Sequence, residues 1–163
     1  MALALLRITI GWHFLYEGVV KIRKPGWSAA GFLLQARGPA ADIYHWMAEN
    51  PDFLNVINEW NKWGLTLIGL GLMVGCLTRL TGSAGIILLM LYYLCNPPFV
   101  GYFYSLPAEG SYLIVNKNLV EATALLVVVV TRAGRFFGLD LILSGRSRRS
   151  DSNKQQAIAA VGE

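Results

Sequence analysis

Charged residues are scarce in this chain of 163 residues: they make up 15% of it, whereas hydrophobic residues make up 55%. A soluble domain of this length usually carries about 25% charged residues. The composition therefore excludes a nucleic-acid-binding domain, a disordered chain and an ordinary cytosolic enzyme. We accordingly expect no nucleic-acid partner.

Cysteine and histidine are also rare. The two cysteines, Cys76 and Cys95, do not form a C-x-x-C pair, which argues against a thioredoxin-like dithiol, and we expect both to be structural and unpaired. Of the two histidines, His45 falls in a polar loop, so a haem held by His13 and His45 is not expected. The sequence has no metal-ligand cluster, so it predicts no metal site. It also lacks a phosphate-binding glycine loop and a Ser/His/Asp arrangement, so catalytic residues stay unassigned.

Long apolar runs are the dominant feature of the chain. A helix needs roughly 20 apolar residues to span a bilayer. Four segments approach that length: residues 2–22, 63–80, 82–95 and 112–131. Strands are not favoured, because a lipid-facing sheet must close into a barrel. The predicted fold is all-α, with residues 1–143 forming a four-helix transmembrane bundle in the lipid bilayer.

The loop between the first two apolar segments is too polar to span a membrane. Its apolar residues recur at spacings of three and four, a pattern typical of amphipathic helices, and Asn50-Pro51 interrupts the pattern. We expect one or two short helices here, lying at the outer membrane face or packing on the loops of the bundle. The residues that carry the pattern are Ile43, Trp46, Met47, Leu54, Ile57 and Trp60.

The distribution of positive charge predicts the orientation. Residues 132–163 carry a net charge of +3 against +1 for residues 1–131, and the loop 96–112 lacks Lys and Arg. The positive-inside rule then makes both termini cytoplasmic, with residues 144–163 as a flexible basic tail. Lys21, Arg23 and Lys24 conflict with this, since they would lie at the outer end of the first helix. Either the orientation is reversed or these charges serve another purpose.

Ionisable residues inside the apolar segments mark a candidate site. An ionisable side chain deep in a bilayer costs at least about 2.5–3.5 kcal/mol, so it usually faces the bundle interior and has a partner. Residues spaced by four share one helix face, and this spacing occurs in both the first and the fourth segment. The candidate ligand-binding residues are His13, Glu17 and Lys21 in the first, and Lys117, Asn118 and Glu121 in the fourth.

Two interpretations of these residues stay open. If the first and fourth helices are neighbours, the residues form one polar pocket that opens outward, with His13 a turn deeper than the two acids. Otherwise Glu17–Lys21 and Lys117–Glu121 are two separate salt bridges within their helices that ease membrane insertion.

Four smaller features have structural interpretations. Asn116 is predicted to cap the fourth helix. Three glycines, Gly69, Gly71 and Gly75, predict close helix packing. Arg79 is placed at the inner end of the second helix, and the aromatic stretch beginning at Tyr92 in an interfacial belt.

The chain resembles the DoxX-type membrane proteins over nearly its whole length up to Leu143. The similar stretches are RITIGWHFLYEGVVKI, LLQARGPAADIYHWM, GLGLMVGCLTRL, NKNLVEATALL and GRFFGLD. This resemblance implies a four-helix bundle in a bacterial-type cytoplasmic (inner) membrane. It also implies an association with redox biology, because one branch of the family is linked to thiosulfate:quinone oxidoreductase.

Three functions are compatible with these features. The first is a membrane redox protein that binds a quinone or a small lipid-like ligand in the polar pocket, where His or Glu could supply a proton. The second is a noncatalytic accessory subunit of a larger membrane complex, or a homo-oligomer. The third is a small transporter with a Glu/His proton relay, which four short helices without an internal repeat make less favourable.

Overall fold

The computed structural model describes residues 1–99, 101–102, 104 and 113–131, and every regular element in these residues is a helix. The all-α prediction is confirmed for this part of the chain. By length and composition, α1 and α5 could each cross a membrane. The six helices are α1 (Ala2–Arg23), α2 (Ala30–Leu33), α3 (Ala41–Glu49), α4 (Pro51–Val74), α5 (Thr78–Cys95) and α6 (Lys117–Val130).

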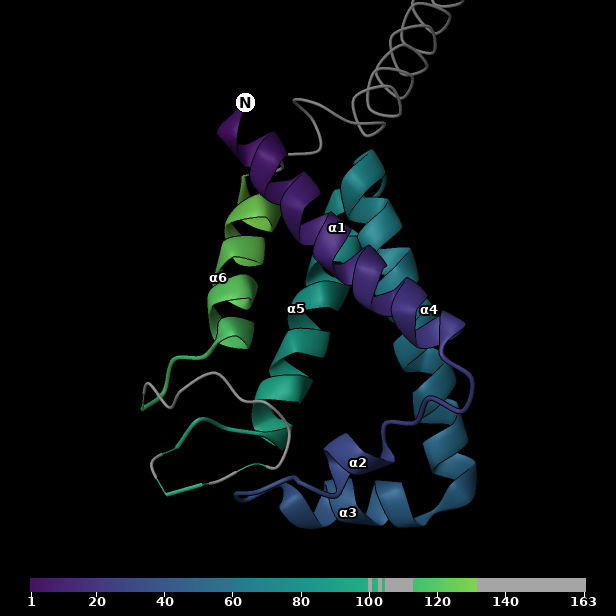
Figure 1. Cartoon of the computed structure of the whole chain (residues 1–163). Helices are drawn as coiled ribbons and strands as arrows, with labels where there is room; N and C mark the ends of the chain where they lie inside the picture. The colour runs from purple at the N-terminus through teal and green to yellow at the C-terminus, as the bar shows by residue number, and fades with distance from the viewer. Residues whose placement is uncertain (100, 103, 105–112, 132–163) are drawn as a thin grey trace, which may run out of the picture.

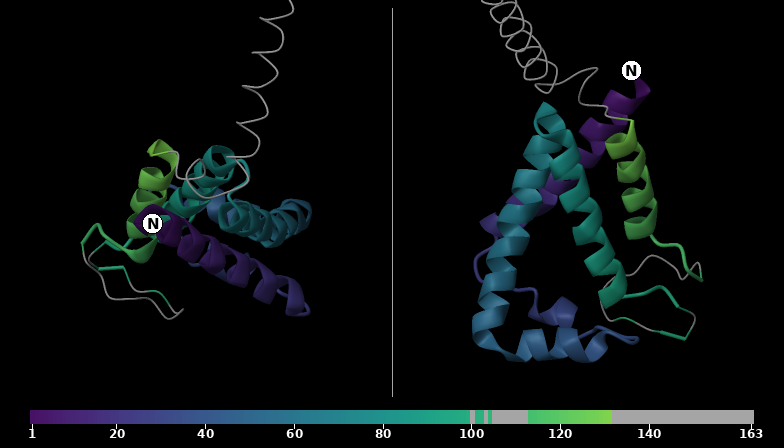
Figure 2. Two further views of the ribbon diagram at one scale, coloured as in Figure 1. Left: turned by 90° about the horizontal axis from the view of Figure 1, so that it is seen from above. Right: turned by 180° about the vertical axis from the view of Figure 1, so that it is seen from behind.

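The four long helices run alternately up and down (Figure 1). The start of α1, the turn between α4 and α5, and the end of α6 lie at one end of the molecule. The short helices α2 and α3 lie at the other end, with α3 running across the base of α4 (Figure 2). Helix α1 crosses α4 obliquely, whereas α6 packs beside α5.

Glycines bring α1 and α4 close together. A Cβ atom on Gly69 of α4 would lie 2.7 Å from the Gly11 carbonyl oxygen, and one on Gly18 of α1 would lie 2.7 Å from the Thr66 amide nitrogen. Neither position has room for a larger residue, so the backbones themselves are in contact. The close packing predicted for Gly69 is therefore confirmed, and it fixes how α1 lies across the bundle. The core beside this crossing includes Phe14, Leu65, Leu72, Leu125 and Val128.

The turn between α4 and α5 corrects one sequence prediction. Residues 63–80 were expected to form one helix, but α4 ends at Val74. Gly75 has a φ of 70°, a left-handed conformation that suits glycine and ends the helix. Arg79 therefore belongs to the first turn of α5 and not to the end of the preceding helix. Gly75 thus acts as a helix cap, a role that the sequence analysis had not assigned to it.

The helical pattern between α1 and α5 is interrupted at Asn50-Pro51, as expected. The residues after this interruption, however, do not form a short helix of their own. Helix α3 ends at Glu49, and α4 begins at Pro51. Proline lacks an amide hydrogen, but at the first position of a helix that hydrogen would have no partner within the helix. The second amphipathic stretch is not a separate helix, since residues 54–60 are the first turns of the 24-residue α4. Helix α3 is tied to α5 by the Tyr44 hydroxyl, which donates to the Leu91 carbonyl at 3.0 Å. Burial raises the pKa of Tyr44, so this donor stays protonated at neutral pH.

The fourth predicted segment begins later than expected. Helix α6 starts at Lys117, and Asn116 caps it by accepting from the Leu119 amide at 3.0 Å, as predicted. Both cysteines are free, which confirms the expectation that they do not pair, and Cys95 is buried. The predicted basic tail, residues 144–163, lies outside the described residues.

Candidate functional site

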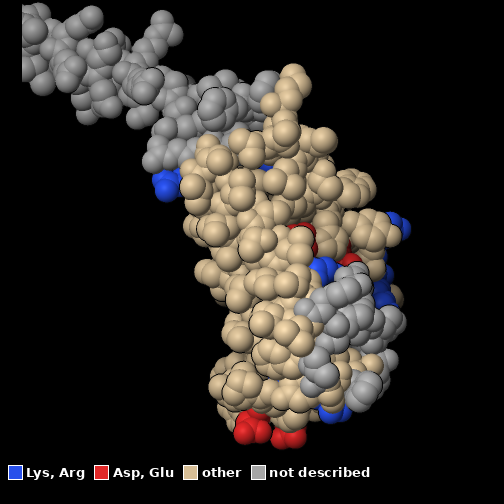
Figure 3. Space-filling view, turned by 90° about the vertical axis from the view of Figure 1, so that its left-hand side faces the viewer, with Lys and Arg blue, Asp and Glu red and all other residues tan. Residues whose placement is uncertain are grey.

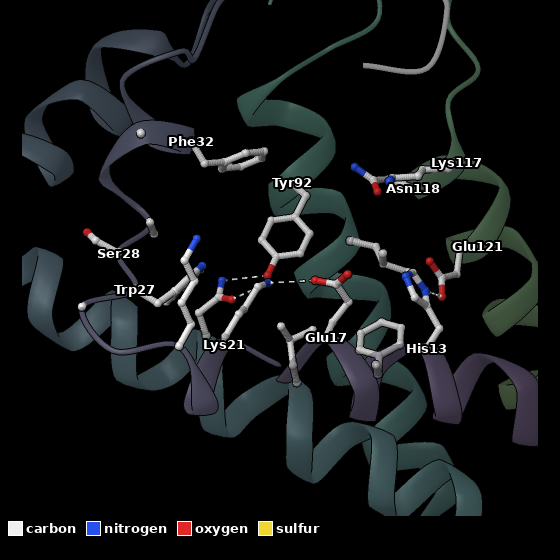
Figure 4. Close-up of a pocket in the computed structure, with 18 residues that line it drawn as sticks. His13, Glu17, Lys21, Trp27, Ser28, Phe32, Tyr92, Lys117, Asn118 and Glu121 are labelled. Atoms are coloured by element: carbon white, nitrogen blue, oxygen red, sulfur yellow. Dashed lines mark hydrogen bonds and ion pairs between the residues drawn. The ribbon is translucent and has the colours of Figure 1, made fainter. Parts of the chain in front are cut away.

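One cavity contains all six candidate residues predicted from the sequence. It has a volume of about 640 Å³ and lies between α1, α4, α5 and α6, with the α1–α2 loop and α2 at its rim. Figure 4 shows the three residues of α1 in a row, facing the three residues of α6. The predicted residues on its wall are His13, Glu17, Lys21, Lys117, Asn118 and Glu121.

A contact between α1 and α6 crosses the cavity. The Nδ1 atom of His13 lies 2.7 Å from Oε1 of Glu121 (Figure 4). A carboxylate can only accept, so Nδ1 carries the hydrogen, and a neutral ring then presents Nε2 as an acceptor. The first and fourth predicted helices are thus neighbours. His13 lies one turn from Glu17 along α1, as predicted, but it lies beside Glu121 and not a turn below it, because α1 crosses the bundle obliquely.

A second polar group lies farther along α1. Lys21 Nζ is 3.6 Å from Glu17 Oε2 and donates to Asn61 Oδ1 at 3.1 Å. Asn61, which is buried, in turn donates through Nδ2 to the Tyr92 hydroxyl oxygen at 2.7 Å. One chain of contacts therefore joins α1, α4 and α5 on the cavity wall.

The two predicted intrahelical salt bridges have different outcomes. The Glu17–Lys21 pair is present. Within the described residues Lys117 and Glu121 form no ion pair, and Glu121 contacts His13 instead. The charges of the first and fourth helices are therefore not two separate, self-contained pairs. Lys117 and Asn118 lie on the cavity wall near the start of α6 (Figure 4).

Aromatic rings form an apolar wall next to the charges. Lys21 Nζ lies 5.2 Å from the Trp27 ring centre and 5.7 Å from that of Tyr92, distances at which a cation is attracted to the ring face. Phe32 packs edge-on against Tyr92 with ring centres 5.6 Å apart. Phe14 and Leu65 extend this apolar lining. The cavity thus combines an aromatic and apolar patch with a larger set of polar and charged side chains.

The polar groups come to the surface in a restricted area. On the face in Figure 3, most of the described surface is uncharged, and acidic and basic side chains appear together in a hollow near mid-height. The side chain of Glu121 is only 13% exposed, whereas that of His13 is 49% exposed. His13 is therefore the more accessible member of the pair.

Several wall residues were not singled out as candidates. Tyr92 was assigned to an interfacial belt. Asn61 directly follows the stretch around Leu54 and Trp60, which was interpreted from its apolar residues alone. Asn61 follows Leu54 and Ile57 on the buried side of α4, and a polar residue at such a position is the signal that could have found it. The further wall residues are Lys24, Trp27, Ser28, Phe32, Asn61 and Tyr92.

The site can hold an amphiphilic molecule and can exchange a proton with it through His13 or Glu121. In the described part of the chain no three His, Cys, Asp or Glu residues are grouped so as to hold a metal ion. Comparison with known proteins gives no further guide: no protein-family model, curated protein or solved structure matches this chain. The DoxX resemblance therefore stays a prediction.

Proposed function

We propose that this chain is a multi-pass membrane protein of DoxX type that binds a quinone or a small lipid-like ligand in the polar pocket and is linked to membrane redox chemistry. Helices α1, α4, α5 and α6 would cross the bilayer of a bacterial cytoplasmic membrane, with both termini cytoplasmic. The observation that carries the proposal is the convergence of His13, Glu17, Lys21 and Glu121 on one cavity beside an aromatic wall.

The outer surface of the helices supports a lipid environment. Large apolar side chains point outward from each of the four long helices, and a soluble monomer rarely exposes such a continuous surface. Exposed fractions are 58% for Trp12, 63% for Leu67, 62% for Ile87 and 71% for Val130. The up-and-down course of the helices fits repeated crossing of a membrane (Figure 2).

The character of the cavity supports an amphiphilic ligand. Its volume of about 640 Å³ lies in the usual range of about 300–1,000 Å³ for small-molecule sites. Lys21 and Glu17 largely neutralise each other, and His13 is held by Glu121. The rest of the wall joins aromatic and apolar side chains to a few polar ones, among them Lys117 and Asn118, so a ring with polar substituents and an apolar chain would fit both parts.

Native mass spectrometry of the full chain, gently extracted from its own membrane, tests the proposal. We expect a bound mass matching a quinone or lipid, and its loss in a Glu17→Gln variant. The matched control is Glu59→Gln, because Glu59 also pairs with a lysine, Lys62, at 2.8 Å, but does not line the cavity. An empty cavity together with a stoichiometric protein partner would contradict ligand binding and favour an accessory subunit.

A further inference from the structure

The Asn61 side chain determines which way the Tyr92 hydroxyl can donate. Lys21 Nζ has only hydrogens to offer, so the Asn61 atom 3.1 Å from it must be the carbonyl oxygen. The Asn61 amide nitrogen is thereby turned toward Tyr92, and the Tyr92 oxygen accepts from it at 2.7 Å. The hydroxyl hydrogen of Tyr92 must therefore point away from Asn61.

That hydrogen has no acceptor among the residues the structure describes. Lys21 is in a similar position, because an ammonium group has three hydrogens. Asn61 takes one of them and Glu17 interacts with a second, so one remains. Both side chains line the cavity, and the Lys21 Nζ atom lies over the Tyr92 ring. Each of these two side chains thus contacts Asn61 and keeps a hydrogen without a hydrogen-bond acceptor in the described residues, on a part of the wall that also contains Trp27 and Phe32.

We propose that Tyr92 and Lys21 together form a two-donor site that binds an uncharged carbonyl oxygen of the ligand, with Asn61 as the residue that orients the Tyr92 hydroxyl. The proposal rests on the proposed function, since it assumes an amphiphile in this cavity. It adds what part of the ligand is recognised and by which atoms. The group that bears the carbonyl would be flat, because the neighbouring wall is aromatic.

At Lys21 itself the neighbouring Glu17 favours an uncharged oxygen over an anion, while Lys24 and Lys117 also line the cavity. Glu17 lies 3.6 Å from Lys21 and offsets its positive charge, so an added anion would gain little from Lys21 and would be repelled by Glu17. A carbonyl oxygen accepts two hydrogen bonds without bringing a charge into a partly buried position. Its two lone pairs match the two donors.

The test uses the full chain in lipid nanodiscs and two probes, 2-decyl-1,4-benzoquinone and decylbenzene, which both carry a decyl chain on a flat six-membered ring but differ in the presence of carbonyl groups. We expect tighter binding of the quinone by the unaltered protein. In Tyr92→Phe its dissociation constant should rise about 2- to 12-fold, the range for one lost hydrogen bond. The infrared carbonyl stretch of the bound quinone should also move to higher frequency, which a purely structural role would not produce.

Matched variants separate this effect from general damage. Tyr93→Phe should leave both readouts unchanged, because the Tyr93 hydroxyl donates to the Ile114 carbonyl at 2.9 Å and does not line the cavity. Asn61→Asp should weaken quinone binding, since a carboxylate would capture the Tyr92 hydrogen. Asn55→Asp adds the same charge on the same helix, at an exposed position that does not line the cavity, so it should not weaken binding.

The possible failures are distinguishable. If neither probe binds the unaltered protein, the proposed function and this inference are both overturned. If decylbenzene binds as tightly as the quinone, or if Tyr92→Phe retains the original dissociation constant and carbonyl frequency, only the two-donor site is overturned. Tighter binding of decanoate than of the quinone would overturn the preference for an uncharged oxygen.

Discussion

The crossing of α1 over α4 can be tested by adding a single methyl group. In a Gly69→Ala variant the three atoms nearest to the new Cβ are all backbone atoms of α1, from Leu15 and Gly11, and the Gly11 oxygen is 2.7 Å away. Backbone atoms cannot rotate aside as a side chain can, so the two helices must separate. Overpacking of this kind typically costs about 1–3 kcal/mol, and rigid backbone neighbours place it at the upper end.

Gly64→Ala is the matched control for this variant. Gly64 lies on the same helix, and an added Cβ would meet nothing within 4 Å. Both substitutions gain the same helix propensity, about 0.8–1.0 kcal/mol. The difference between the two variants therefore isolates the steric cost, and Gly69→Ala should be less stable than Gly64→Ala by about 3 kcal/mol, the upper end of that range.

Unfolding by SDS in mixed micelles, followed by circular dichroism, measures both free energies. Equal stability of the two alanine variants would refute the close crossing of α1 and α4. A fall in stability for both would instead mean that α4 does not tolerate alanine for some other reason, and the helix positions would have to be reassigned.

Two further predictions concern the ends of the helices. Asn116→Ala removes the acceptor for the Leu119 amide and should lower the unfolding free energy by about 0.5–2 kcal/mol, whereas Asn118→Ala, which removes no cap, should not; equal losses would contradict the cap. A maleimide should label Cys76, which is partly exposed, faster than the buried Cys95, and a non-reducing gel should show no internal disulfide. Equal labelling rates would contradict the assigned burial.

Local sequence signals predicted much of the helical framework. Asn50-Pro51 marked an interruption of the helical pattern, because proline disfavours a helical residue before it, and α3 and α4 meet at this point. Asn116 was recognisable as a cap because its side chain can replace the missing acceptor of the first turn. These features depend on neighbours in the sequence, so no knowledge of the tertiary structure was needed.

The extent of α4 could not be predicted in the same way. Its first half is polar and its second half apolar, so a search for apolar runs detected only the second half. The opposite error occurred at Gly75, where an apolar run continues through a left-handed residue. The hydropathy of a segment indicates whether it lies in an apolar environment, whereas the ends of a helix depend on backbone conformation. The ends of an apolar run and the ends of a helix therefore need not coincide.

The candidate site shows the same division between local and tertiary information. The spacing of His13, Glu17 and Lys21 placed them on one face, and the structure brings that face to the cavity. The partner of Glu121 was not predictable, because it depends on the angle at which α1 crosses the bundle. Tyr92 could not be separated by sequence from Tyr93, although only Tyr92 lines the cavity.

The glycines and the charges of α1 are therefore parts of one arrangement. Gly11 and Gly18 let α1 lie directly against α4, and the resulting oblique course carries His13 to α6 while Lys21 stays beside α4 and α5. A larger residue at either glycine would move both ends of the polar stripe. This arrangement also gives Lys21 and Lys24 a place on the cavity wall, so their position at the end of α1 has a local explanation. In the orientation we propose, these two lysines would contribute to the pocket, whereas Arg23 does not line the cavity and still conflicts with the positive-inside rule.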